Sequence, residues 1–194
     1  MPLDENFRLK IDDYKGENGG IVFPNPNAPT GIYESLDHVE EIIKKNPDVI
    51  VIVDEAYIDF GGETALPLID KYDNLVVVRT FSKSRSMAGL RIGYAISNPE
   101  LIKALNDVKY SYNSYTMNRP SLVLGVESIH DDAYFREKVG QIIATRERFV
   151  KEIAELGFTC LPSTANFVFA THESIPAKEI FAAAKENNIY VRYF

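Results

Sequence analysis

Short runs of apolar residues alternate with amphipathic stretches through the first half of the chain. The continuous apolar runs Ile21–Phe23, Val49–Val53 and Leu75–Val78 are typical of strands buried on both faces. From Leu36 to Ile43, apolar positions recur at helical spacing, which predicts a helix capped by Ser35. Strands that alternate with helices in this way indicate a largely parallel sheet.

The same alternation continues beyond the third apolar run. A short helix with irregular ends is predicted at Thr64–Tyr72, and a further strand at Ile92–Ile96. Asn98 and Pro99 form a strong helix start, because asparagine caps helices and proline suits the first helical position. The polar and aromatic composition of Lys109–Pro120 predicts a loop that leaves this part of the chain.

The remaining residues show a different order of elements. A helix is predicted at Ser121–His130, and a much longer one runs from a cap at Asp131 or Asp132 to Gly157. A strand at Asn166–Ala170, a helix at Pro176–Asn187 and a strand at Ile189–Tyr193 follow. This order predicts an α+β arrangement for the end of the chain.

We therefore predict an α/β fold with a mostly parallel sheet and flanking helices, followed by part of a smaller α+β domain. Residues 1–117 are assigned to a large domain, 118–157 to connecting helices and 158–194 to a partial small domain. The last predicted strand ends without a polar tail, so the chain is expected to be a cut piece of a longer protein.

Composition excludes several classes of function. No stretch approaches the ~18 consecutive apolar residues of a membrane helix, and the acidic start of the chain does not resemble a secretory signal. A formal net charge of -7 argues against a nucleic-acid-binding surface. The single cysteine, Cys160, suits a reducing cytoplasm, and the three scattered histidines have no metal-ligand spacing.

One polar stretch, Thr80–Tyr94, holds Lys83 among hydroxyls, two glycines and two arginines. A lysine near fixed cations at the end of a buried strand has its ammonium form disfavoured, which leaves a free amine that can form a Schiff base. Ser82, Thr80 and Arg91 are donors suited to a phosphate group. Together they suggest a phosphorylated aldehyde such as pyridoxal phosphate, although an ordinary polar surface loop would show the same residues.

Two further loops should meet Lys83 at one edge of the sheet, because the carboxyl ends of parallel strands share an edge where ligands bind. The Pro24–Gly31 loop is made rigid by its prolines. Asp54 and Glu55 follow the second apolar run directly. Since successive strand side chains alternate, only one of these carboxylates can face inward, and we predict that it is Asp54.

The three loops together resemble the pyridoxal-phosphate aminotransferases of the aspartate-aminotransferase-like superfamily. Asn27-Ala28-Pro29-Thr30-Gly31 is similar to the superfamily's Asn-Pro-Thr-Gly loop, Asp54-Glu55-Ala56-Tyr57 to its Asp-Glu-x-Tyr motif, and Ser82–Tyr94 to its lysine signature. Within the superfamily, the segments Arg79–Lys83, Ser163–Phe167 and Val191–Phe194 most resemble histidinol-phosphate aminotransferases.

The resemblance implies a role for each matching residue in binding pyridoxal 5'-phosphate. Lys83 would bind the cofactor and move a proton between the substrate's Cα and the cofactor's C4' carbon. Asp54 would pair with the pyridine nitrogen, and Tyr57 would hydrogen-bond the ring's phenolic oxygen. Asn27 could make a second contact to this oxygen. The cofactor's phosphate would be held by Thr80, Ser82 and Arg91.

The resemblance also implies a reaction and partners. An amino group would pass between histidinol phosphate, or a related amino acid, and 2-oxoglutarate or glutamate, in histidine biosynthesis. Arg192 and Asn166 match positions that can contact the substrate, although both are equally compatible with ordinary strand roles. A homodimer is implied, with small-molecule substrates and neither nucleic acid nor membrane as partner.

The sequence also differs from the superfamily's pattern at several points. Ala28 occupies the position where the superfamily usually has the asparagine that contacts the cofactor. Arg85 has no assignable role and is expected to face solvent. The N-terminal phosphate loop, the ring-stacking aromatic and a C-terminal carboxylate-binding arginine are missing from the match, so the chain is expected to be poorly active by itself.

Other functions remain open at this stage. A decarboxylase or carbon-sulfur lyase would use the same lysine and aspartate, and a non-catalytic binding module could retain the fold. A magnesium-dependent nucleotide hydrolase is disfavoured because the chain has no Gly-x-x-x-x-Gly-Lys-Ser/Thr loop.

Overall fold

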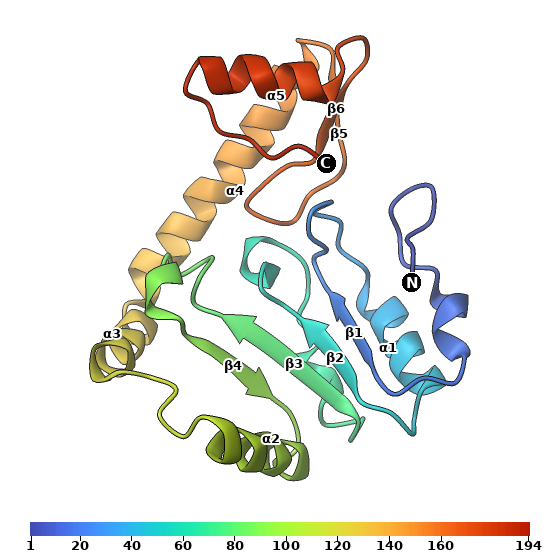
Figure 1. The fold of residues 1–194 in the computed structure, drawn as a ribbon, viewed down its shortest axis with the longest axis vertical. Coiled ribbons are helices and arrows are strands. Elements are labelled where there is room, and N and C mark those ends of the chain that lie inside the picture. Colours follow the sequence, from blue (N-terminus) through green and yellow to red (C-terminus); the bar gives the residue numbers. More distant parts are fainter.

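The computed structural model describes residues 1–194 and contains two sheets joined by helices (Figure 1). In the larger sheet, with strand order β1-β2-β3-β4, the first three strands are parallel and the fourth is antiparallel to β3. In the smaller sheet two strands pair in antiparallel fashion. The strands are β1 (Ile21–Pro24), β2 (Val51–Asp54), β3 (Leu75–Thr80), β4 (Gly93–Ile96), β5 (Phe158–Cys160) and β6 (Ala170–His172).

Five α-helices and four short 3-10 helices connect and cover these strands, and no helix is both long and apolar enough to cross a membrane. The α-helices are α1 (Leu36–Lys45), α2 (Pro99–Tyr112), α3 (Arg119–His130), α4 (Asp132–Ala154) and α5 (Ala177–Glu186). The 3-10 helices are η1 (Ile11–Lys15), η2 (Ile58–Phe60), η3 (Leu66–Leu68) and η4 (Ala88–Leu90).

The fold class predicted from the sequence is confirmed, and the predicted caps explain why the helices begin where they do. The Ser35 hydroxyl accepts a hydrogen bond from the His38 N–H at 3.4 Å, and the Asn98 side chain accepts one from the Leu101 N–H at 3.0 Å. Asp131 caps α4 through the Tyr134 N–H at 3.4 Å. Each cap satisfies an N–H group that the first helical turn leaves without a partner.

Some predicted boundaries were wrong. Residues 109–112 continue helix α2, and residues 64–72 contain only η3. The strand predicted at 166–170 begins at Ala170, because the Ser163 hydroxyl donates to the Phe167 carbonyl at 2.6 Å and closes a turn there. Strand β5 was not predicted. The division at residues 117 and 157 stays a prediction.

Residues 189–193 form no strand, contrary to the sequence-based prediction. The Ile189 N–H donates to the Ala184 carbonyl at 2.9 Å and closes the end of α5, and Asn188 has a φ of 60°. A strand needs a neighbour to receive its backbone hydrogen bonds, and the smaller sheet consists of β5 and β6 alone. The apolar alternation of this segment therefore remains exposed.

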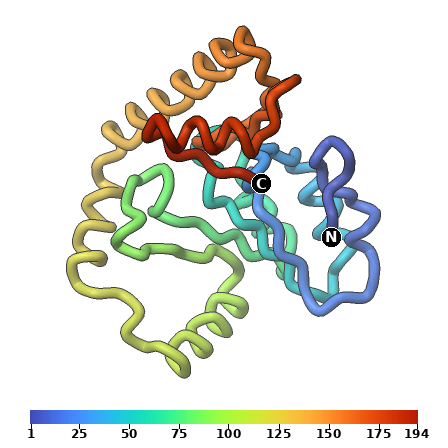
Figure 2. Tube along the Cα trace, turned by 45° about the horizontal axis from the view of Figure 1, so that its top comes forward, coloured from blue at the N-terminus to red at the C-terminus, as the bar shows by residue number.

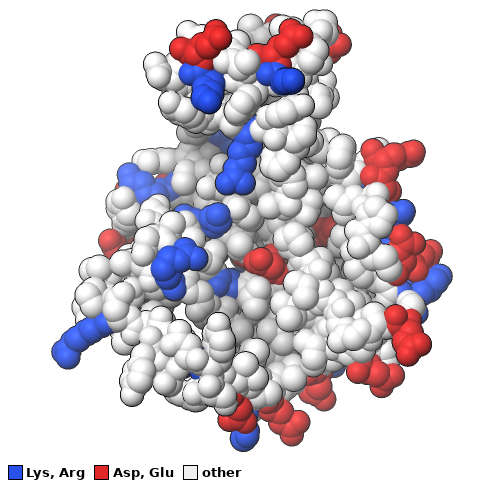
Figure 3. Space-filling model, in the orientation of Figure 1, with Lys and Arg blue, Asp and Glu red and all other residues white.

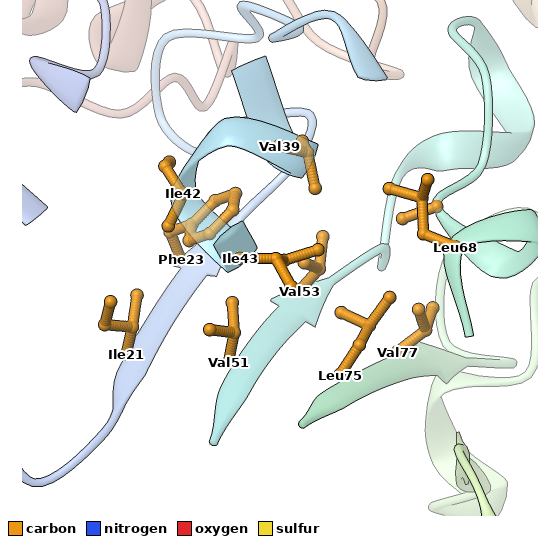
Figure 4. Packing of buried hydrophobic residues seen from close by; sticks show 11 residues of the cluster. Ile21, Phe23, Val39, Ile42, Ile43, Val51, Val53, Leu68, Leu75 and Val77 are labelled. Atoms are coloured by element: carbon orange, nitrogen blue, oxygen red, sulfur yellow. The ribbon is translucent and has the colours of Figure 1, made fainter. Parts of the chain in front are cut away.

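The main hydrophobic core lies on one face of the larger sheet, against α1 (Figure 4). Phe23, Val51 and Val77 from three neighbouring strands meet Val39 and Ile42 from the helix, all with 2% exposure or less. The opposite face is more open. Val22, whose side chain alternates with those of the core residues of β1, is 67% exposed.

Helix α4 leads away from the larger sheet to a unit made of β5, β6 and α5, which lies beyond the carboxyl ends of β1–β3 (Figures 1 and 2). The segment before β6 contacts this edge directly, since the Thr164 N–H donates to the Gly31 carbonyl at 2.9 Å. Arg146 of α4 donates to the Phe60 carbonyl at 3.1 Å and to the Ala165 carbonyl at 2.7 Å. These bonds join the two units at the edge predicted to bind ligand.

A buried ion pair fixes the chain just beyond strand β2. The Glu55 carboxylate, with its side chain 1% exposed, accepts hydrogen bonds from Arg79 Nε and Nη2 at 2.9 and 2.8 Å. It also accepts bonds from the Thr64 hydroxyl at 2.8 Å and the Ala65 N–H at 2.6 Å. Burial tends to lower the pKa of Arg79, but Glu55 outweighs it, so this pKa lies above the usual arginine value.

This ion pair corrects the prediction that Asp54 is the carboxylate that faces inward. Glu55 shares the buried face with Val51 and Val53, whereas Asp54 is half-buried on the other face. As strand alternation requires, only one of the two adjacent carboxylates faces the core, but this carboxylate is Glu55 and not Asp54. Glu55 can be buried because Arg79 neutralises its charge.

Replacing a buried helical isoleucine by alanine should cost far more unfolding free energy than replacing an exposed one. Ile42→Ala should lower the free energy of unfolding by about 2–5 kcal/mol, because it leaves a cavity at a fully buried site. Ile129→Ala, at a position 54% exposed, should change it by less than about 0.5 kcal/mol. Urea unfolding followed by circular dichroism measures both. Equal losses would contradict the assigned core.

Breaking the buried ion pair should likewise cost more unfolding free energy than breaking an exposed one. Glu55→Ala leaves the buried Arg79 guanidinium without its partner and should cost about 3–5 kcal/mol of unfolding free energy. Asp107→Ala removes the exposed pair between Lys103 and Asp107 of α2 and should cost less than about 0.5 kcal/mol. Urea unfolding at low salt tests this, and a loss for Glu55→Ala as small as for Asp107→Ala would refute the structural role of the buried pair.

Candidate active site

The register of the larger sheet brings the three predicted loops to one edge. Pro24 lies opposite Asp54, and Asp54 lies opposite Val78. Backbone bonds continue this pairing past the strand ends, because the Asn25 N–H donates to the Asp54 carbonyl at 2.9 Å and the Glu55 N–H to the Val78 carbonyl at 2.8 Å. The loops after β1, β2 and β3 therefore start side by side, as predicted.

Lys83 and Tyr57 lie together at this edge. The Lys83 Nζ is 5.1 Å from the centroid of the Tyr57 ring, within the range of a cation-π contact. Both side chains are half-buried. The Tyr57 ring also packs edge-on against Phe167, with centroids 5.0 Å apart and the rings at 90°. Phe167 thus brings the second unit onto the same tyrosine.

Asp54 ends strand β2, three residues before Tyr57. Its Oδ1 accepts a hydrogen bond from the Ala56 N–H at 3.0 Å, so the carboxylate is fixed by the turn that follows it. The side chain is half-buried on the sheet face opposite the main core. A carboxylate held in this way remains able to accept a further hydrogen bond from a ligand.

The three residues predicted to hold a phosphate differ in their availability. The Thr80 hydroxyl already donates to the Ile92 carbonyl at 3.2 Å and accepts from the Ser82 N–H at 3.0 Å. Arg91 is exposed, has a left-handed backbone with φ of 55°, and donates to the Ala88 carbonyl at 2.9 Å. Ser82 is half-buried beside Lys83. Thr80 is the last residue of β3, and Ser82 and Arg91 belong to the loop that follows it, which the Phe81 N–H closes by donating to the Ile92 carbonyl at 3.1 Å.

Asn27 lies in the loop after β1, as predicted, but its side chain is engaged within that loop. Its Nδ2 donates to the Thr30 hydroxyl at 2.7 Å. The neighbouring Ala28 is exposed. Asn25 is the most deeply buried asparagine of the loop and is fixed by two bonds to the Glu34 backbone, at 2.8 and 2.9 Å.

The two predicted substrate contacts lie in the second unit. Asn166 is exposed and lines a groove of about 600 Å³ together with Phe167 and residues of α4, among them Arg146 and Arg148. Arg192 is exposed in the segment after α5. Neither side chain has a hydrogen bond to the Lys83 loop, but Ser86 of that loop lines the same groove as Asn166.

Charged side chains are unevenly distributed around this edge. On the face drawn in Figure 3, Lys and Arg side chains gather between the sheet and the second unit around a small acidic patch, while acidic side chains dominate the right and lower margins. The chain as a whole has a net charge of -7. The basic side chains therefore form a local region suited to an anionic ligand on an acidic protein.

Sequence reasoning missed several residues that shape the site. Arg85 does not face solvent as expected: its guanidinium carbon is 4.1 Å from the centroid of the Phe135 ring, and its Nη1 donates to the Ser128 carbonyl. The Ser84 hydroxyl, which is buried, donates to Asp59. The one signal in the sequence that could have pointed to Asp59 is its position two residues after Tyr57.

Comparison with known proteins places these observations in a family. The family model for aminotransferase class I and II matches residues 1–194. The chain is 51% identical over 192 residues to the histidinol-phosphate aminotransferase of Clostridium botulinum, covering 99% of this chain and 54% of that protein. The chain therefore spans about half the length of the curated relatives that it matches.

Solved structures show the same fold in more than one enzyme. The histidinol-phosphate aminotransferase from Sinorhizobium meliloti in complex with pyridoxal-5'-phosphate matches with a TM-score of 0.87 at 25% identity, covering 99% of this chain and 55% of that one. A decarboxylase from Sulfurospirillum multivorans matches with a TM-score of 0.86 at 28% identity, covering 99% and 59%.

The match of the family model over the whole chain agrees with the three ordered motifs and with the common edge to which the sheet brings them. The resemblance seen in the sequence is thereby confirmed, and the chain belongs to the class I and II aminotransferase family.

Proposed function

We propose that this chain carries the central part of a pyridoxal-phosphate-dependent aminotransferase of histidine biosynthesis, which transfers an amino group between histidinol phosphate and 2-oxoglutarate or glutamate. The observation that carries this proposal is the position of Lys83 beside Tyr57, on loops that adjoin Asp54. The relatives with about 50% identity support the choice of substrate. A cytoplasmic homodimer belongs to the same proposal.

The residues present fit the chemistry of pyridoxal phosphate. Lys83 offers an amine for the aldehyde, Asp54 a carboxylate for the pyridine nitrogen, and Tyr57 a phenol for the ring oxygen. Ser82 and Arg91 offer donors for the phosphate. Thr80 would join them, and Asn27 would contact the ring oxygen, once each gives up the hydrogen bond that it makes within its own loop. The region rich in Lys and Arg side chains supports an anionic group there (Figure 3).

Each side chain then has a distinct task. When bound, pyridoxal phosphate supplies an aldehyde that condenses with amines and a ring that draws electrons away from the substrate's Cα. Lys83 would hold the cofactor through its amine and, once released by the substrate, would accept the proton that leaves the substrate's Cα. The Asp54 carboxylate keeps a proton on the pyridine nitrogen. The Tyr57 hydroxyl orients the ring oxygen.

A decarboxylase is the second candidate, because a solved decarboxylase shares the fold and 28% of the sequence. Lys83 and Asp54 would serve both reactions, since each passes through a carbanion at Cα that the ring stabilises. Product analysis separates them: an aminotransferase yields a keto product and a new amino acid, and a decarboxylase releases carbon dioxide.

Lys83 should be the residue that captures the cofactor. Incubation with pyridoxal phosphate followed by borohydride should attach a reduced adduct to Lys83, as read by peptide mass spectrometry, because reduction makes the lysine linkage permanent. Lys83→Ala should lose this adduct. Lys103→Ala, at an exposed lysine of α2, should keep it. An unlabelled Lys83 in the wild-type chain would rule out the catalytic proposal.

Turnover by this chain alone should be weak. Arg91 and Arg192 are exposed and the Thr80 hydroxyl is already bonded, so few fixed contacts would orient the cofactor and substrate. We expect a rate on the order of 10²-fold below that of a full-length relative, the loss typical of a small misplacement of reacting groups. A coupled assay with histidinol phosphate and 2-oxoglutarate measures it, and a rate equal to the relative's would contradict the expectation.

A further inference from the structure

Lys83 is the first residue of a tight turn whose two central residues are anchored to different parts of the protein. The Ser86 N–H donates to the Lys83 carbonyl at 3.0 Å, which closes the turn. The Met87 N–H donates to the Phe81 carbonyl at 3.0 Å and closes the wider loop. Ser84 and Arg85 occupy the centre of the turn, so their contacts determine where the Lys83 backbone lies.

Ser84 anchors the turn to the loop that carries Tyr57. The Ser84 hydroxyl donates a hydrogen bond to the Asp59 carboxylate, and Ser84 is only 4% exposed. Asp59 lies two residues after Tyr57, in the middle of η2, which Tyr57 immediately precedes. A hydrogen bond to an ionised acceptor away from solvent is stronger than one between neutral groups. This bond therefore ties the residue next to Lys83 to the segment next to Tyr57.

Arg85 anchors the same turn on its other side. Its guanidinium carbon lies 4.1 Å from the Phe135 ring centroid and 5.6 Å from that of Phe81. Its Nη1 donates to the carbonyl of Ser128, in the last turn of α3, where helix carbonyls lack partners within the helix. Arg85 thus connects the turn to the corner between α3 and α4.

We propose that Ser84 and Asp59 are positioning residues that hold the Lys83 amine against Tyr57, with Arg85 bracing the turn from the opposite side. Without the Ser84–Asp59 bond, the turn keeps its backbone closure but loses its link to the Tyr57 loop. The Lys83 amine then samples more positions, and fewer of them suit reaction with the cofactor's aldehyde. This inference rests on the proposed cofactor role of Lys83.

The experiment compares five variants of the chain with the wild type, one of them the double variant Ser84→Ala with Asp59→Ala. Ser84→Ala and Asp59→Ala each remove the bond. Asp59→Asn keeps an acceptor oxygen but loses its charge, so it should retain part of the effect of the bond. Ser174→Ala changes an exposed serine in the loop after β6, away from the turn and the groove, and serves as the control. The measurements are the rate of borohydride-trapped pyridoxal phosphate attachment to Lys83, its pH profile, and hydrogen exchange of residues 81–91 without cofactor.

We expect Ser84→Ala and Asp59→Ala to slow attachment to Lys83 roughly tenfold, the usual effect of one charge-assisted hydrogen bond, and to shift its pH profile. Both should speed hydrogen exchange in the turn. The double variant should be no slower than either single variant, because the two side chains act through one bond. Asp59→Asn should fall between the wild type and the alanine variants, and Ser174→Ala should stay at the wild-type rate.

Unchanged attachment rates and pH profiles in both alanine variants would overturn the positioning role, whatever their stability in urea. Additive effects in the double variant would also overturn it, because the two residues would then act separately. Absence of attachment in the wild type, with faster exchange in both alanine variants, would instead locate the failure in the proposed function. Hydrogen exchange at the wild-type rate in both alanine variants would show that the Ser84–Asp59 bond does not hold the turn.

Discussion

The buried carboxylate of Glu55 is the constraint on which the edge of the sheet depends. It accepts bonds from Arg79 at the end of β3 and from Thr64 and Ala65 in the connection between β2 and β3. Two strand ends and their connection are thereby joined at one charged centre in the interior. Leaving any of these donors unpaired in a buried site is costly, so the ends of β2 and β3 keep a fixed relation.

The residues proposed to bind cofactor lie next to this fixed centre in the sequence rather than within it. Asp54 precedes Glu55 on the opposite face of the strand, Tyr57 follows two residues later, and Lys83 follows Arg79 by four residues. The charged pair is buried, whereas Asp54, Tyr57 and Lys83 are half-buried. Residues that bind ligands can occupy loops because a rigid scaffold supports those loops.

The second unit completes the site from above through a small number of contacts. Phe167 packs on Tyr57, and Thr164 bonds to the Gly31 carbonyl in the loop after β1. Helix α4 carries Arg146, which bonds carbonyls in both units. These contacts connect the proposed cofactor residues with the groove that contains Asn166, so the part of the structure proposed to bind substrate adjoins the part proposed to bind cofactor.

The amino-acid sequence by itself determined the elements whose signals are local. Apolar runs identified β1, β2 and β3, caps such as Ser35 and Asn98 identified helix starts, and the order of three motifs identified the family. These signals are readable because helix caps and strand periodicity depend on residues close together in the chain. The meeting of the three loops at one edge also followed, from the general geometry of parallel strands.

Only the tertiary structure decided which carboxylate is buried, how the Lys83 turn is held and whether the last apolar segment forms a strand. Glu55 is buried because Arg79, 24 residues away, supplies its counter-charge. Arg85 is held by Ser128, 43 residues away. Residues 189–193 alternate like a strand but have no neighbouring strand to bond. In each case the outcome depends on a partner distant in sequence, and a local pattern contains no record of that partner.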